Sequence, residues 1–209
     1  DLKIEIEEEL KRFDASLSPF NDTSVISKVN RNKDIITDTL FQNVFNRSMQ
    51  ISEMTGGAFD ITIAPLANAW GFGFKKGAWP DKHMVDSLLE LTNYRNVSLV
   101  EGKVVKKDPR IMISCSAVAK GYATDVIAQF LQRKGIQNNM VDIGGELALK
   151  GTNPRNQTWR VGINKPVDDS LSVNQELQLV LQLTDLGVAT SGNYRNYYYK
   201  DGKKYAHTI

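Results

Sequence analysis

The sequence predicts an α+β fold with mostly antiparallel sheets and with helices packed on them. Segments with helical periodicity cluster in the first half of the chain. Short segments rich in strand-forming residues cluster in the second half, and one long helical segment lies between the two groups. Helices followed by strands, rather than regular alternation, are typical of the α+β class.

Composition is that of a protein with a real hydrophobic core. The 209 residues are 41% hydrophobic, and no apolar run approaches the ~20 residues that a membrane span requires. The net charge is only +2, and no basic stripe with interleaved aromatic residues occurs, so nucleic acid is excluded as the expected partner. The single Cys115 excludes an internal disulfide and a cysteine zinc cage.

Capping residues and helical periodicity predict where the helices begin and end. Residues 1–16 form a charged amphipathic helix, and a short helix follows through Val25 and Val29. A longer helix begins after Thr37 or Asp38 and ends at the glycine pair 56–57. Another begins after Pro80 with Asp81 as its cap, and the central helix ends at Gly135.

The expected strands are short and joined by tight turns. Hairpins are predicted around Glu101-Gly102 and Asp201-Gly202, and glycines 144 and 145 interrupt a strand over 139–150. The remaining expected strands are 111–113, 159–163, 176–183, 187–189, 194–199 and 203–209. No repeat or linker occurs, so we expect one domain over 1–209. Because the chain opens inside a helix and stops inside a strand, we expect that domain to be truncated at both ends.

The segment SAVAKGYATD at 116–125 is the most informative motif. It follows the expected strand 111–113 and precedes a segment of helical periodicity, so free N–H groups and a positive helix end should meet there. Lys120 adds a cation, and small residues allow a ligand to approach the backbone. This predicts a phosphate-bearing ligand, although no P-loop sequence is present. The alternative is an ordinary strand-to-helix turn packed with small residues.

Four further segments carry polar groups, and each also has a structural interpretation. Asp60, Thr62, Trp70 and Gly71 suit an aromatic-walled pocket or an ordinary core. The run DIGGE at 142–146 suits either a bulge or a backbone that meets a ligand. TSGNY at 190–194 has the composition of a turn, and His207 is a lone strand histidine. No nucleophile elbow, zinc helix or Rossmann turn occurs.

The order of these motifs resembles one family. The relevant runs are LSPFNDTSVISKVN at 17–30, TGGAFDIT at 55–62, PL at 65–66, WGFG at 70–73, AVAKGYATD at 117–125, IGGEL at 143–147, TSGNYR at 190–195, and the histidine at 207. In this order they resemble the FAD:protein FMN transferase family, known as ApbE. The resemblance covers nearly the whole chain and implies the ApbE-like fold, with the C-terminal part of the family domain missing.

The resemblance implies a substrate and a metal. Such proteins take FAD and Mg²⁺, transfer the FMN half onto a Thr hydroxyl of an acceptor flavoprotein, and release AMP. It assigns catalytic roles to Lys120, Asp125 and His207, and a magnesium-binding carbonyl to Ala117. It assigns FAD contacts to Phe20, Asp60, Thr62, Trp70, Gly71, Ala119, Lys120, Gly121, Asp142, Gly144, Gly145, Ser191 and Gly192.

Two departures from the family pattern matter. Phe20 stands where the family often has a tyrosine, so it can stack on the adenine but cannot donate a hydrogen bond. The family's magnesium-binding Asp and Thr lie in a D-P-x-T-G run expected just past Ile209.

Two close alternatives remain for the activity, and a structural domain without a ligand is a third. One is an FAD pyrophosphatase that yields FMN and AMP, and another is an FAD-binding protein without turnover. The resemblance also implies a periplasmic or cell-envelope location, as a trimmed lipoprotein that is lipid-anchored in its native form. It implies an acceptor that is a subunit of a membrane redox complex.

Overall fold

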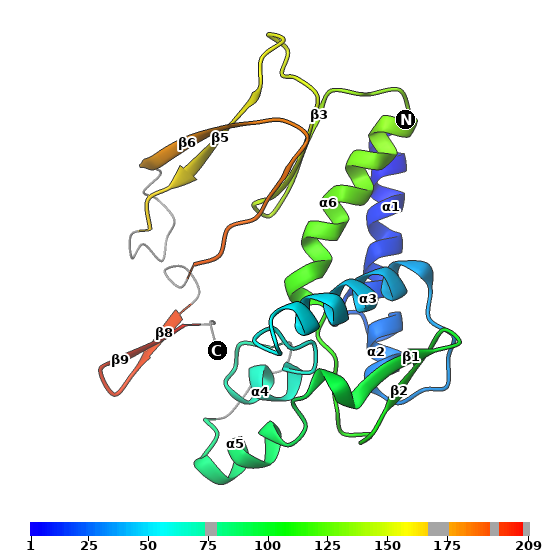
Figure 1. Cartoon of the computed structure of the whole chain (residues 1–209), viewed down its shortest axis with the longest axis vertical. Helices are drawn as coiled ribbons and strands as arrows, with labels where there is room; N and C mark the ends of the chain where they lie inside the picture. The colour runs from blue at the N-terminus through cyan, green and yellow to red at the C-terminus, as the bar shows by residue number, and fades with distance from the viewer. Residues whose placement is uncertain (74–78, 167–175, 193–196, 207–209) are drawn as a thin grey trace. The chain divides into compact units, whose positions relative to one another are not determined.

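The computed structural model describes residues 1–73, 79–166, 176–192 and 197–206, and Figure 1 traces the chain. The chain divides into two compact units, Asp1–Ala119 and Lys120–Ile209. The helix α6 (Ser116–Arg133) spans the boundary between them. Each unit is described separately below.

The first unit is mainly helical, as the periodicity predicts. Its helices are α1 (Leu2–Leu17), α2 (Val25–Asn30), α3 (Thr39–Met54), α4 (Ala64–Ala69) and α5 (Lys82–Leu89); a 3₁₀ turn (Tyr94–Asn96) then leads into the hairpin β1 (Val97–Val100) and β2 (Lys103–Lys106).

Side chains cap these helices as expected. Asp38 accepts a hydrogen bond from Phe41 N at the start of α3, and Asp81 accepts one from Met84 N at the start of α5. Each bond satisfies a first-turn N–H that has no partner within the helix. Helix α4 was not predicted, because its six residues are too few to show a helical period.

The core of the first unit gathers apolar side chains from helices and from the segments that follow them. Phe41 and Phe45 on α3 stack with their ring centroids 6.1 Å apart, and both are fully buried. Other fully buried members are Ile26, Ile61, Ile111 and Ile113. Helix α1 packs against α2 and α3. This core holds in place the loops that carry the candidate residues of the unit.

Ile111 and Ile113 are buried, but residues 111–113 do not form the strand that their apolar run predicts. The Asn30 side chain forms hydrogen bonds with the backbone of Ile113 instead. Its Nδ2 donates to Ile113 O at 2.9 Å, and Ile113 N donates to its Oδ1 at 2.8 Å. Ser114 N donates to Ile61 O. Because a side-chain amide satisfies these groups, no neighbouring strand is needed.

The second unit contains α6 and antiparallel strands. Strands β3 (Asn139–Ile143), β4 (Glu146–Lys150) and β7 (Gly187–Val188) form one sheet in that order. Strand β5 (Trp159–Asn164) pairs with β6 (Leu177–Leu183), and β8 (Tyr197–Lys200) pairs with β9 (Lys203–Ala206). Every pairing among the described strands is antiparallel, so the predicted α+β class is confirmed. The expected strand over 139–150 is a hairpin that turns at its glycine pair.

No helix in the described part of the chain is both long enough and apolar enough to span a membrane.

Candidate functional site

The start of α6 differs from the predicted turn. The helix begins at Ser116, so Lys120 and Gly121 lie one turn inside it. Val118 N and Ala119 N both donate to Cys115 O, at 3.0 and 2.8 Å, and Ser116 N donates to Ser114 Oγ. Within the described residues, this leaves the N–H of Ala117 as the unpaired backbone donor of the first turn. Of the free N–H groups predicted for the 116–125 motif, those at Lys120 and Gly121 are therefore not available, because these residues belong to the helical ladder.

Lys120 is held by the turn between β3 and β4. Its Nζ lies 2.6 Å from Glu146 Oε2 and donates to Gly144 O at 3.3 Å. The Lys120 side chain is 53% exposed, whereas that of Glu146 is 19% exposed. The carboxylate is therefore fixed in the protein, while the ammonium group stays accessible to a ligand. Sequence reasoning missed Glu146, whose position directly after the glycine pair was the available signal.

Glycines 144 and 145 form the two-residue turn of this hairpin. Their φ values of +60° and +93° belong to the left-handed region, as a type I′ turn requires. Asp142 Oδ1 accepts a hydrogen bond from Gly145 N at 2.9 Å, which fixes the turn from inside the hairpin. The structure thus brings together four predicted site residues, namely Lys120, Asp142, Gly144 and Gly145.

A cavity of about 270 Å³ adjoins the same turn. Asp142 and Gly145 line it together with residues of β5 and with Thr190. Thr190 directly precedes Ser191, which is exposed, and Gly192, which is half-buried. The predicted residues at 142–145 and the start of the 190–192 segment therefore share one hollow of the second unit.

Within the described residues no ion pair joins Asp125 to Lys120, whose ionic partner is Glu146 instead. Partial desolvation raises the pKa of Asp125, and the positive charge of Lys150 opposes that shift. The catalytic role of Asp125 stays a prediction. His207 lies outside the described residues, so its predicted role beside the phosphate also stays a prediction.

In the first unit, Asp60 serves as an internal hydrogen-bond hub. Its Oδ1 accepts bonds from Thr62 N at 2.8 Å and Thr62 Oγ1 at 2.6 Å, and its Oδ2 accepts one from Tyr94 N at 2.8 Å. Thr62 is fully buried. These contacts show Asp60 and Thr62 fixing the loop, and their predicted FAD contacts remain predictions.

The aromatic residues of the same stretch are more accessible. Trp70 is half-buried and meets the Trp79 ring edge-on, with the centroids 5.3 Å apart. Gly71 is exposed and has a φ of +78°, and no atom of the described residues beyond its chain neighbours lies within 4 Å of the position that a Cβ would take. This is the open backbone that a flat ligand requires.

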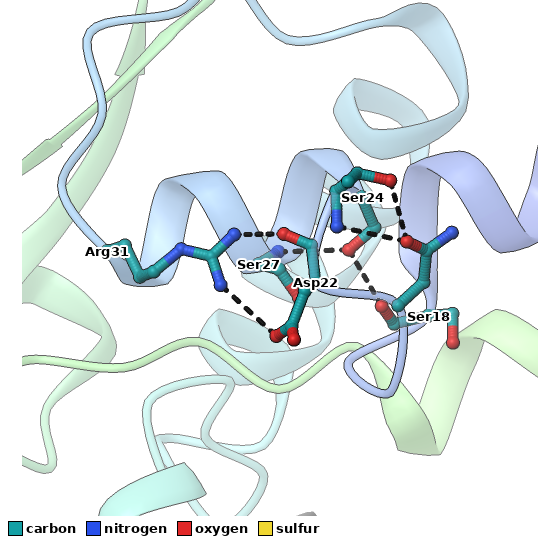
Figure 2. A network of polar contacts seen from close by, with 7 residues as sticks. Ser18, Asp22, Ser24, Ser27 and Arg31 are labelled. Atoms are coloured by element: carbon teal, nitrogen blue, oxygen red, sulfur yellow. Dashed lines mark hydrogen bonds and ion pairs between the residues drawn. The ribbon is translucent and has the colours of Figure 1, made fainter.

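Phe20 is 81% exposed and lines a cavity of about 480 Å³. The polar network of Figure 2 holds the loop that carries it. Ser24 Oγ donates to Ser18 O at 2.7 Å and accepts from Ser27 N at 3.1 Å. Arg31 pairs with the Asp22 carboxylate at 3.2 Å and donates to its backbone oxygen. The ring is thus presented on a fixed loop, as stacking on a base requires.

The described residues do not by themselves fit a magnesium centre. Mg²⁺ takes six oxygen ligands in octahedral geometry, usually including one or two carboxylates. In the part of the chain that the structure describes, no three side chains of His, Cys, Asp or Glu gather in one place. Ala117 contributes at most a backbone carbonyl from the first turn of α6.

Cys115 is not suited to nucleophilic catalysis. Its side chain is buried, and burial raises the pKa of its thiol to about 12. A thiolate is the reactive form of cysteine, and here it is strongly disfavoured.

The fold is that of the flavin transferases. Over its whole length the chain matches the solved structure of flavin transferase ApbE from Vibrio cholerae, with a TM-score of 0.86 and 32% identity, and it covers 66% of that chain. It matches the ApbE protein of Thermotoga maritima with the same TM-score and 26% identity, covering 67% of that chain.

The family model described as "ApbE family" matches residues 2–209, and the chain belongs to this family. A curated relative from Vibrio cholerae, named FAD:protein FMN transferase, is 36% identical over 100% of this chain and 63% of its own length. The protein of that name from Escherichia coli K12 is 32% identical over 100% of this chain and 61% of its own length. The chain therefore spans less than two thirds of these curated relatives.

Proposed function

We propose that this chain belongs to an enzyme that transfers FMN from FAD to a hydroxyl group of an acceptor flavoprotein. Relatives named FAD:protein FMN transferase match the chain from end to end, and this supports the proposed class of reaction. The observation that carries the proposal is the accessible Lys120 ammonium group at the Gly144-Gly145 turn. A cation beside open backbone is the arrangement that a diphosphate needs.

The proposed reaction balances as a phosphoryl transfer. The acceptor Thr oxygen forms a bond to the phosphorus of the FMN half, and the bond from that phosphorus to the bridging oxygen breaks. AMP leaves with the bridging oxygen, and the Thr proton passes to a base. No oxidation or reduction occurs. Such reactions depend mainly on positioning and on neutralising charge, which are the tasks that Lys120 would perform.

Lys120 would gain a second ionic partner when the diphosphate binds. In the structure its charge is compensated by Glu146. A diphosphate that approached from the solvent side would share the ammonium group, while Glu146 kept the side chain directed at the turn. Phe20 would stack on the adenine, and Trp70 and Gly71 would border the flavin.

Magnesium dependence is part of the proposal. Bound to the diphosphate, Mg²⁺ would neutralise developing charge. Ala117 would supply a backbone carbonyl, and among the described residues no cluster of three His, Cys, Asp or Glu side chains completes the site. Dialysis against a chelator should therefore abolish transfer, and added Mg²⁺ should restore it.

The acceptor and the location are also proposals. We propose an acceptor that is a subunit of a membrane redox complex, and a periplasmic or cell-envelope location for a trimmed, lipid-anchored protein. The support is the resemblance to the family. Fractionation of cells that express the full natural protein, followed by immunoblotting, tests the location.

Mass spectrometry of an acceptor tests the activity. The protein is incubated with FAD, Mg²⁺ and a flavoprotein that carries the target Thr, and the expected product is a covalent FMN phosphoester on that Thr. An acceptor with Thr→Val at the target site is the control and should stay unmodified. Release of FMN and AMP without an adduct would establish a pyrophosphatase instead. Binding of FAD without turnover in the full natural protein would establish a storage protein.

A further inference from the structure

A basic cavity lies beside strand β2 in the first unit, among residues to which the proposed function assigns no role. Its volume is about 410 Å³. The chain segment 29–37, which links α2 to α3, forms one wall, and β2 forms the other. Lys33, Lys103 and Lys106 line it, together with a single carboxylate, that of Asp34.

The two walls are tied together at both ends of the cavity. Thr37 N and Oγ1 donate to Gly102 O at one end, at 2.8 and 2.7 Å. Lys106 Nζ donates to Val29 O and to Asn32 Oδ1 at the other end, at 2.8 and 2.9 Å. Segment 29–37 therefore runs antiparallel to β2. The closed ends exclude an added peptide strand and favour a small molecule.

Strand β2 presents unpaired main-chain groups on this side. Lys107 N donates to Asn96 O, so the register makes the pairs Ser98–Val105 and Val100–Lys103 hydrogen-bonded. The alternate residues Val104 and Lys106 then direct their N–H and C=O groups away from β1. Within the described residues neither of these N–H groups has a partner.

Charge in the cavity is unbalanced. Lys103 pairs with Asp34 at 2.7 Å, but the partners of Lys106 are both neutral. Burial without a counter-ion lowers the pKa of Lys106 to about 8. Lys33 is exposed at the rim. The cavity thus offers two main-chain N–H donors and an uncompensated ammonium group, which are the groups that bind oxyanions.

We propose that the cavity between segment 29–37 and β2 binds a small oxyanion, a phosphate or a carboxylate, through Lys106, Lys33 and the N–H groups of Val104 and Lys106. None of these residues is assigned to the flavin site, so this proposal does not depend on the proposed function.

Titration of the ¹⁵N-labelled protein with inorganic phosphate tests this proposal, and a second titration with succinate distinguishes the two sources of oxyanion. We expect saturable shifts of the Val104 and Lys106 amide signals with at least one of the two anions. Lys106→Gln should weaken binding by about tenfold or more, since a bond to a charged group contributes ~1.5–3 kcal/mol. Lys33→Gln should weaken it by about two- to fivefold, as expected of a more exposed charge.

Lys107→Gln is the matched control, because it removes the same charge from the neighbouring exposed position and should leave the affinity unchanged. Binding to the wild type should be roughly tenfold weaker at pH 9 than at pH 7, as Lys106 loses its proton. The other charged groups that line the cavity are Lys33, Asp34 and Lys103.

Non-saturating shifts, or equal losses from the 106 and 107 variants, would overturn the proposal. If Lys106→Gln fails to fold, the Lys33→Gln variant decides, and wild-type affinity in that variant counts against the site.

Discussion

Lys120 is the side chain to which the proposed function gives the most direct chemical role, because it combines exposure with a fixed partner. Replacement by alanine removes the ammonium group, and we expect the Kd for FAD to rise by about tenfold or more. Flavin fluorescence titration measures this change. Lys11→Ala, at an exposed position on α1, is the control and should bind as the wild type does.

A substitution of Glu146 tests how the carboxylate beside Lys120 affects the binding of the diphosphate. In Lys120→Ala the carboxylate stays behind without its cation and repels the diphosphate. The double variant with Glu146→Gln should therefore recover part of the lost affinity. An identical Kd in the single and double variants would show that Glu146 acts only on the fold of the hairpin.

Asp60 is a structural residue by its contacts, although the sequence motif also assigns it to FAD. Its three accepted hydrogen bonds join the loop at 60–62 to Tyr94. Asp60→Asn replaces one accepting oxygen with a donor, so the free energy of unfolding should fall by about 1–3 kcal/mol. Urea denaturation measures this loss. Asp86→Asn, which affects an exposed pair with Lys82 on α5, should cost less than about 1 kcal/mol.

Cys115 should be inert to thiol reagents in the folded protein. With a pKa of about 12, only about one thiol in ten thousand is ionised at pH 8, and the side chain is also buried. Iodoacetamide should modify it only in denaturant, which intact mass spectrometry detects. Rapid modification of the native protein at pH 8 would contradict the packing around Cys115.

At the scale of elements, caps and turn residues predicted most of the helices and hairpins. Asp38, Asp81 and the Glu101-Gly102 turn lie where their local chemistry placed them, because each acts on neighbouring residues only. The strand predicted at 111–113 does not form. Its backbone pairs with the Asn30 amide, which is distant in sequence and could not be inferred from the apolar run. The start of α6 was misplaced because small residues are equally compatible with a turn and with a first helical turn.

The candidate site could also be predicted only in part. Motif order pointed to Lys120 and to the glycine pair, which the structure brings together. The sequence signal for Glu146 was only its position directly after the glycine pair, because its ion pair with Lys120 depends on how α6 packs against the β3–β4 turn.

Gly121 offers a prediction on helix α6. It lies inside the helix, and in the part of the chain that the structure describes no atom outside the adjacent helix backbone comes within 4 Å of the position that a Cβ would take. Gly121→Ala should stabilise the ligand-free protein by about 0.5–1 kcal/mol and raise the Tm by roughly 1–4 °C. If FAD approaches this backbone as the family resemblance implies, the same variant should weaken FAD binding.

Gly145→Ala is the counterpart on the β3–β4 turn. Its φ of +93° is strained for any residue with a side chain, so this variant should lower the Tm. Thermal denaturation followed by circular dichroism compares the two variants. Equal effects of the same sign would contradict the backbone assignments.

At the scale of the whole molecule, the family match runs through both units, from residue 2 to residue 209. Candidate FAD contacts lie in both: Phe20, Trp70 and Gly71 in the first, and the Lys120 group in the second. Hydrogen exchange measured with and without FAD tests the predicted contacts of each unit by itself: protection near Phe20 and Gly71 supports those of the first unit, and protection near Lys120 supports those of the second.

The most direct measurement is a structure of the protein determined with FAD bound. The account predicts a diphosphate oxygen within hydrogen-bond distance of Lys120 Nζ, beside the Gly144-Gly145 turn. A diphosphate bound elsewhere, with Lys120 still paired only with Glu146 and Gly144, would contradict it.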